Sequence, residues 1–162
     1  MKKLIGGTAV FVTGAALVIA ATALATLGLG VTSTPLAGGR LEPIDVKVKT
    51  DEWKLRLETK GVSDLSVTEN RVAPGGHFGW HSHPGPSLVI VKSGTSTFYS
   101  GEDPECTPHV HPAGTAYVDP GGLVHIARNE STTEDLVLLV TRLVPNGAAQ
   151  RIDEPNPGNC PF

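Results

Sequence analysis

The sequence predicts an all-β domain, either a sandwich or a barrel, for the chain beyond Val31. Two observations predict this fold class. Short apolar runs rich in β-branched residues alternate with turns rich in glycine and proline, as in sheets of many short strands. In addition, no segment after Val31 repeats its apolar residues with the 3.6-residue period of a helix. The length of 162 residues corresponds to one domain.

The expected strands differ in how clearly they are patterned. Residues 53–58 alternate between apolar and charged side chains, which predicts a half-buried strand. Residues 87–94 form an apolar run too short for a helix, which predicts a buried strand that turns back as a hairpin at Ser93-Gly94. The other stretches that we expect to contain strands are residues 65–72, 95–101, 115–122, 124–129 and 135–144.

The N-terminal stretch differs from the rest of the chain in composition. Lys2 and Lys3 precede a run from Leu4 to Val31 that contains no charged residue. A positive start followed by an apolar core is the pattern of an export signal, and the run exceeds the roughly 20 residues that cross a bilayer as a helix. We expect a cleaved signal peptide or a retained anchor, and both place the remainder outside the cytoplasmic membrane. A buried core helix is a weaker alternative because the run has no polar face.

The domain boundaries follow from this composition. Cleavage is expected at a small-x-small site, either Ala23-Leu24-Ala25 or Val31-Thr32-Ser33. The next residues are small and include two glycines and two prolines. We therefore expect a signal peptide or N-terminal membrane anchor in residues 1–33, a linker in 34–43 and a single domain in 44–162.

Cys106 and Cys160 are the two cysteines of the chain, and both follow the apolar run. An even number of cysteines in an exported protein favours a disulfide, and the alternative is two independent thiols. A disulfide here would close a long loop, for which chain entropy predicts a contribution of about 4 kcal/mol. It would also hold the C-terminal tail, which is rich in proline and glycine.

The charge balance limits the partners. The chain has 16 acidic and 13 basic residues, and aromatic residues make up 5% of it. There is no cluster of basic residues, so the sequence excludes nucleic-acid binding. Contact with a membrane is expected only through the N-terminal segment.

Three histidines, His77, His81 and His83, lie close together before the apolar run that begins at Ser87. On a strand, side chains two residues apart point to the same face. His81 and His83 could therefore hold one divalent metal, although a solvated strand face gives the same pattern.

A second stretch, residues 114–129, decides between a metal site and a solvated strand face. The residues Gly75, His81, His83 and Gly94 have the spacing of the first motif of the cupin superfamily. The residues Gly114, Pro120, Gly122, His125 and Asn129 have the spacing of its second motif. The chain therefore resembles the cupin superfamily. The stretches around the motifs, GWHSHPGPS and CTPHVHPAG, also resemble those of small exported single-domain cupins of bacteria. The resemblance implies a cupin jelly-roll barrel, a double-stranded β-helix, with a metal in its mouth.

The resemblance also implies the ligands. Carried over by position, they are His81, His83 and His125, which would hold Fe, Mn, Ni, Cu or Zn. The place that the first motif gives to a glutamate is occupied here by Ser87, so the site retains three histidines, as in the thiol dioxygenases of the superfamily. His77 is a possible replacement ligand, although we expect a supporting or surface role.

Other polar residues have simpler interpretations. Tyr117 is expected to line the pocket, and Asp119 to act as a turn residue before Pro120. Asn129 is expected to bond to the backbone around the turn, and Trp80 to face away from the metal. A second pair, His109 and His111, is expected on a solvated strand face, with a surface metal site as the alternative.

Three functions agree with the sequence. The first is a metal-dependent oxygenase that acts on a small molecule outside the cytoplasm. The second is a non-catalytic module that binds a small molecule or a metal. The third is a barrel with a vestigial site. The resemblance also implies a possible homodimer, to which the apolar stretch 135–144 could contribute.

Overall fold

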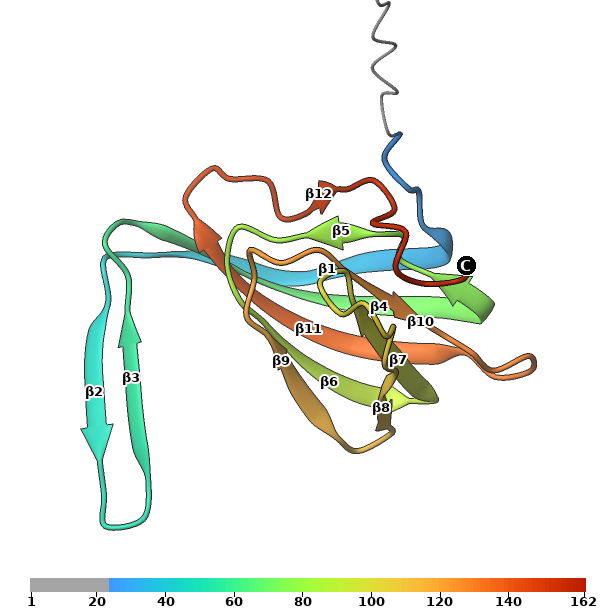
Figure 1. Ribbon diagram of the computed structural model, residues 1–162. Coiled ribbons are helices and arrows are strands. Elements are labelled where there is room, and N and C mark those ends of the chain that lie inside the picture. The colour runs from blue at the N-terminus through green and yellow to red at the C-terminus, as the bar shows by residue number, and fades with distance from the viewer. Residues whose placement is uncertain (1–23) are drawn as a thin grey trace, which may run out of the picture.

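The computed structural model describes residues 24–162, and its regular structure is entirely β, which confirms the predicted fold class (Figure 1). Within these residues there is no helix that is long and apolar enough to cross a membrane. The strands are β1 (Leu29–Leu41), β2 (Asp45–Lys49), β3 (Lys54–Glu58), β4 (Ser63–His77), β5 (His81–Ser82), β6 (Ser87–Ser93), β7 (Thr95–Ser100), β8 (His109–Pro112), β9 (Ala116–Asp119), β10 (His125–Arg128), β11 (Leu136–Pro145) and β12 (Ile152–Asp153).

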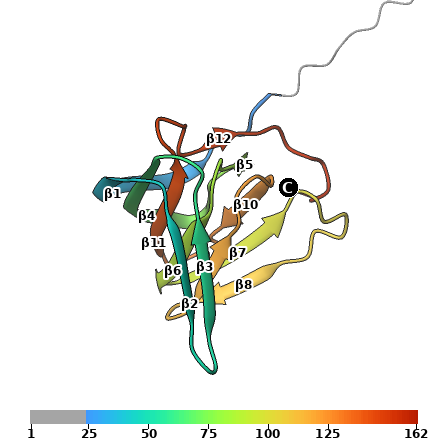
Figure 2. The same cartoon turned by 90° about the vertical axis from the view of Figure 1, so that its left-hand side faces the viewer.

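Ten of these strands curl into a nearly closed barrel with two facing halves (Figure 2). One half has the order β1-β4-β11-β6-β9, and the other has the order β12-β5-β10-β7-β8. The halves join where β10 meets β4, through the pairing of Arg128 with His77. The barrel interior between the two halves is therefore reached by side chains from both.

Two apolar clusters hold the barrel together. The first fills the interior between β4, β6 and β11, where alternate residues point inward. Its buried members are Val72, Val89, Val91, Leu136, Leu138 and Val140. The second contains Trp80, which is 2% exposed, together with Ile126 and Cys160. Trp80 thus does not belong to the cluster that fills the barrel interior. This agrees with the prediction that it faces away from the metal.

The structure corrects two predictions about the run that forms β6. Only one face of β6 is buried, because Leu88 and Ile90 are 53% and 50% exposed while Val89 and Val91 face the core. In addition, β6 does not form a hairpin with β7. It pairs with β11 and β9, whereas β7 pairs with β10 and β8. The glycine turn at Gly94 therefore carries the chain from one half of the barrel to the other, a path that turn residues alone do not distinguish from a hairpin.

The strand predicted for residues 53–58 is present as β3, but it is exposed on both faces rather than half-buried. It pairs with β2 in a hairpin that projects from the barrel (Figure 1). Val46 lies opposite Leu57 and Val48 lies opposite Leu55. The alternation therefore gives the hairpin one apolar face, which the barrel does not cover.

The expected linker in residues 34–43 is also corrected, since most of it belongs to β1. This strand pairs with β4 from Leu29 to Leu41, with register shifts between Leu29 and Val31 and between Pro35 and Ala37. An outer strand tolerates the proline and the glycines that suggested a linker, because it has one neighbour only. The sheet thus begins before residue 44. The expected signal peptide or anchor lies largely in residues 1–23, outside the described part of the chain, and the homodimer stays a prediction.

Candidate metal centre

Three histidines converge at one end of the barrel interior. His81 begins β5, His83 follows it, and His125 begins β10 directly opposite His81. Their side chains are 3–4% exposed, and one ring nitrogen from each lies within 4.8 Å of the others. The structure therefore brings together the three residues that the cupin motifs indicated, from two neighbouring strands.

Backbone carbonyls fix the orientation of each imidazole. Nδ1 of His81 lies 2.9 Å from the Gly79 oxygen, and Nδ1 of His125 lies 3.0 Å from the Leu123 oxygen. Nδ1 of His83 lies 2.7 Å from the oxygen of Gln150. A carbonyl only accepts hydrogen bonds, so each Nδ1 must carry the proton. The three Nε2 atoms are left with lone pairs, as in metal-binding histidines held by backbone oxygens.

Burial keeps these imidazoles neutral. Desolvation lowers the pKa of His81 to about 2, with a further contribution from the charge of neighbouring His125. Desolvation likewise lowers the pKa of His83 to about 4 and also lowers that of His125. At neutral pH, protons therefore compete little for the nitrogens that would bind a metal.

The loops that carry the ligands touch through their backbones. The Gly122 N–H donates a 2.7 Å hydrogen bond to the oxygen of His83. A Cβ atom at Gly121 would lie 2.5 Å from the oxygen of Gly85, and the φ of Gly121 is +79°. The Pro-Gly-Gly turn thus brings the two backbones into close approach, which only glycine allows here. It fixes the distance between the His81–His83 segment and the strand that begins with His125.

Asp119 at the end of β9 is the site residue whose role the sequence did not predict. Its Oδ1 accepts a 3.0 Å hydrogen bond from the Gly121 N–H, which is the turn role that was expected. Its Oδ2, however, lies 3.6 Å from Nε2 of both His83 and His125 and is buried without a hydrogen-bond partner. Asp119 lies two residues after Tyr117 on the same strand, so both side chains point to the same face. This shared face was the sequence signal that could have placed Asp119 beside the cavity.

Ser87, which occupies the place of the missing glutamate, faces Asp119 across the β6–β9 pair. Its hydroxyl accepts a 3.2 Å hydrogen bond from Nε of Arg142, which lies beside it on β11. Within residues 24–162, no carboxylate forms an ion pair with Arg142. Burial lowers the pKa of its guanidinium, although Asp119 opposes the effect. The site therefore has a partly buried cation close to its carboxylate.

A cavity of about 240 Å³ adjoins the histidines. Its polar lining includes Ser87, Tyr117, Asp119 and Arg142, and apolar side chains such as Val89, Phe98 and Leu138 also line it. Ligand pockets usually have volumes of about 300–1,000 Å³, so this cavity suits a small molecule. Tyr117 lines it as predicted, and its hydroxyl lies 3.2 Å from Oγ of Ser96.

The remaining histidines lie apart from this centre. His77 ends β4, where its Nδ1 accepts a hydrogen bond from the Gly79 N–H, and it does not line the cavity. His109 and His111 lie on β8, and His111 stacks on the ring of Tyr117 with a centroid distance of 4.2 Å. Asn129 bonds to backbone groups on both sides of its turn, including the oxygen of Val72 at 3.0 Å, as predicted.

Comparison with known proteins agrees with this geometry. A family model described as "Cupin domain" matches residues 69–142, which include both motifs and all three histidines. This part of the chain is a cupin domain. No curated protein matches the chain.

Several solved structures are similar to this chain in fold. A cupin superfamily protein from Desulfitobacterium hafniense is 12% identical, with 70% of this chain and 77% of that chain covered and a TM-score of 0.47. A conserved protein with a double-stranded β-helix domain from Klebsiella pneumoniae is 24% identical, with coverages of 70% and 80% and a TM-score of 0.46. An oxalate oxidase is also 24% identical, with coverages of 76% and 55% and a TM-score of 0.50.

Proposed function

We propose that this cupin binds a divalent transition metal through His81, His83 and His125, and that it uses the adjoining cavity to bind a small anionic molecule. The observation that carries the metal is the convergence of three unprotonated Nε2 atoms in a buried site. Imidazole nitrogen suits Fe, Mn, Ni, Cu and Zn, and the donor set does not select one of them.

The anionic character of the ligand follows from the charges around the cavity. Arg142 presents a guanidinium to the cavity without an ion-pair partner among residues 24–162. A bound divalent metal would add two positive charges, against the one carboxylate of Asp119. A small carboxylate would bind to the metal with one end and accept hydrogen bonds from Arg142, since arginine matches the planar geometry of carboxylates.

Arg142→Met should therefore weaken the binding of small carboxylates to the metal-loaded protein by at least about tenfold, because charge-assisted hydrogen bonds are worth about 1.5–3 kcal/mol. Calorimetric titration with mono- and dicarboxylates would measure the change, and neutral analogues of the same size would serve as ligand controls. Arg71→Met is the matched control, because Arg71 is an exposed arginine paired with Asp135. Equal affinity in the wild type and Arg142→Met would refute the anionic ligand.

An oxygenase is the more specific form of this proposal. A metal with three histidine ligands retains open positions at which it could activate O₂ or a bound substrate. In that case the chain would hold the substrate at Arg142, and the apolar lining of the cavity would exclude water. O₂ uptake by the metal-loaded protein with thiols, phenols, diketones and carboxylates would test this activity. Ligand binding without O₂ uptake or product would instead support the non-catalytic binding module.

We also propose that the domain acts outside the cytoplasm. The uncharged run from Leu4 to Val31 and the Cys106–Cys160 disulfide support this location. The structure favours cleavage after Ala25 over cleavage after Ser33, because the later site would remove the first residues of β1. Thr26 also contributes to the fold, since its hydroxyl accepts a 2.6 Å hydrogen bond from the Trp80 N–H.

Expression of the full chain in a bacterial host should therefore give an exported protein that begins at Thr26. Cell fractionation followed by intact-mass measurement would test both points. Ala25→Leu should prevent the cleavage, because signal peptidase requires a small residue there. Cytoplasmic protein of full length, with two reduced thiols, would contradict export; exported protein of full length would indicate the anchor instead.

A further inference from the structure

The further inference concerns the carboxylate that the first cupin motif lacks. Ser87 stands in its place, and Asp119 lies directly opposite Ser87 in the β6–β9 register. Paired residues on adjacent strands point to the same face of the sheet. Asp119 can therefore reach the same space as a side chain at position 87, from the neighbouring strand. The Ser87 hydroxyl is itself occupied by Arg142.

The Asp119 carboxylate is oriented toward the histidines and lacks a partner of its own there. The Gly121 N–H holds Oδ1 at 3.0 Å, so Oδ2 points inward, where it is buried and has no hydrogen bond. A buried carboxylate oxygen without a partner is costly and uncommon in native proteins. Its position therefore indicates a group that this chain's own side chains do not supply.

The histidines cannot supply that partner as hydrogen-bond donors. Their protons lie on Nδ1, where each donates to a backbone oxygen. The Nε2 atoms of His83 and His125, each 3.6 Å from Oδ2, therefore present lone pairs to a carboxylate that also presents lone pairs. Three acceptor groups, Oδ2 and the two Nε2 atoms, therefore lie close together without a proton among them. A cation between them would satisfy all three.

The distances agree with a shared ion. Donors that each lie about 2.0–2.2 Å from one metal are separated from one another by roughly 3.0–3.4 Å at tetrahedral or octahedral angles. The observed 3.6 Å separations between Oδ2 and the two Nε2 atoms need a contraction of only a few tenths of an ångström. Asp119 is thus close enough to His83 and His125 to share an ion with them.

We propose that Asp119 is the fourth metal ligand of this cupin. The carboxylate missing from β6 is then supplied by β9, from the strand position opposite Ser87. The site then has three nitrogen donors and one oxygen donor. Ser87 binds Arg142 instead of the metal, and both residues line the cavity. This inference rests on the proposed metal binding and identifies a ligand of that site.

Asp119→Asn tests the proposal, because asparagine has nearly the same shape and can still accept the Gly121 hydrogen bond. We expect the affinity for Zn²⁺ and Mn²⁺, measured by competition with a chromogenic chelator, to fall by at least about tenfold. The visible spectrum of the Co²⁺ form should also change. Asp64→Asn is the matched control, because Asp64 also accepts a backbone hydrogen bond from a glycine but does not line the cavity, and it should bind metal as the wild type does.

A second measurement uses the wild-type protein and does not depend on the folding of a variant. The infrared difference between the Zn²⁺-loaded and metal-free protein should contain a shift of carboxylate stretching bands, and Asp119→Asn should abolish it. The metal-free variant should melt no lower than the metal-free wild type, because the substitution removes a buried charge.

The proposal would be overturned if Asp119→Asn bound metal within about twofold of the wild type, or if the wild-type carboxylate bands did not shift on metal binding. In either case the three-histidine site would still stand. A wild-type protein that bound no metal would instead overturn the proposed function itself.

Discussion

Replacing both His81 and His83 by alanine is expected to abolish metal binding. The wild-type protein should take up about one equivalent of metal per chain, and the variant should lose more than about 10³-fold in affinity, because two of the converging nitrogens are removed. Metal analysis of untagged protein after loading and gel filtration would measure the stoichiometry. Chelator competition would measure the loss of affinity.

The matched control is His109→Ala/His111→Ala. This pair has the same spacing and also lies on a strand, but it is not part of the cluster formed by His81, His83 and His125. We expect the control to keep the wild-type stoichiometry. Equal metal content in the wild type and His81→Ala/His83→Ala would contradict the metal centre. Loss of metal in His109→Ala/His111→Ala alone would indicate that the metal binds at His109 and His111 instead.

The three histidines of the candidate metal centre could be predicted from sequence because the cupin motifs that indicate them are local. His81 and His83 lie two residues apart, and His125 follows a Pro-Gly-Gly turn, so the short segments that carry them are recognisable without the fold. Position alone then indicated that the glutamate was missing. The carbonyl partners were not predictable, however, because Gln150 lies 67 residues from the His83 that it orients.

Asp119 illustrates what the sequence could not provide. Its turn role depends on Gly121, two residues away, and was predicted. Its approach to the histidines depends on the register between β6 and β9, which is set by the packing of the whole barrel. The same limit explains the incorrect hairpin at Gly94, because a turn does not determine which strands pair.

The burial of a strand could not be predicted from its own residue pattern alone. Alternation correctly indicated that β3 has an apolar face, but burial of that face needs a second surface, and the β2–β3 hairpin projects away from the barrel. Conversely, the prolines and glycines of β1 suggested a linker, yet an outer strand accommodates them. Composition thus reports local backbone preference, whereas the position of a strand in the sheet decides its burial.

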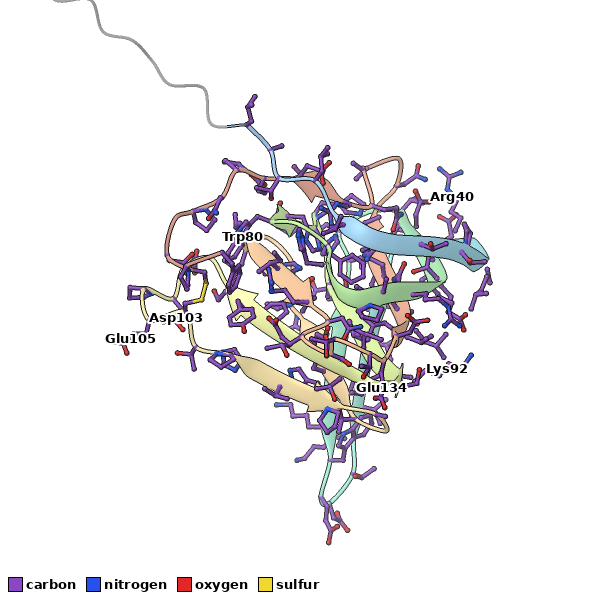
Figure 3. All side chains as sticks on the ribbon, turned by 90° about the vertical axis from the view of Figure 1, so that its right-hand side faces the viewer. Arg40, Trp80, Lys92, Asp103, Glu105 and Glu134 are labelled. Carbon is purple, nitrogen blue, oxygen red and sulfur yellow. A yellow bond between two sulfur atoms is a disulfide. The ribbon has the colours of Figure 1, made fainter. Side chains whose placement is uncertain are left out.

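Removing the Cys106–Cys160 disulfide is expected to lower the free energy of unfolding by about 4 kcal/mol, since it releases a loop with a sequence separation of 54. The disulfide lies beside Asp103, on the same side of the molecule as Trp80 (Figure 3). Urea unfolding of Cys106→Ala/Cys160→Ala beside the wild type would measure the difference. The loss includes packing, because Cys160 is buried against Trp80.

The same change should weaken metal binding, although neither cysteine belongs to the cluster of His81, His83 and His125. The C-terminal tail that the disulfide anchors pairs with β5, where Asp153 lies opposite His81. The same tail segment supplies the Gln150 oxygen that holds His83. A looser tail would let these imidazoles rotate, and loss of such supporting contacts typically costs about 10–100-fold in metal affinity.

Chemical reduction provides the control for this prediction. A phosphine reductant should lower the stability and the metal affinity of the wild type to the level of Cys106→Ala/Cys160→Ala and leave the variant unchanged. A stability difference below about 1 kcal/mol would contradict the prediction, because chain entropy alone predicts more for a loop of this length. A large loss of stability with unchanged metal affinity would show that β12 holds β5 without help from the disulfide. In that case the pairing of Ile152 with Ser82 and of Asp153 with His81 would be sufficient to orient the ligands.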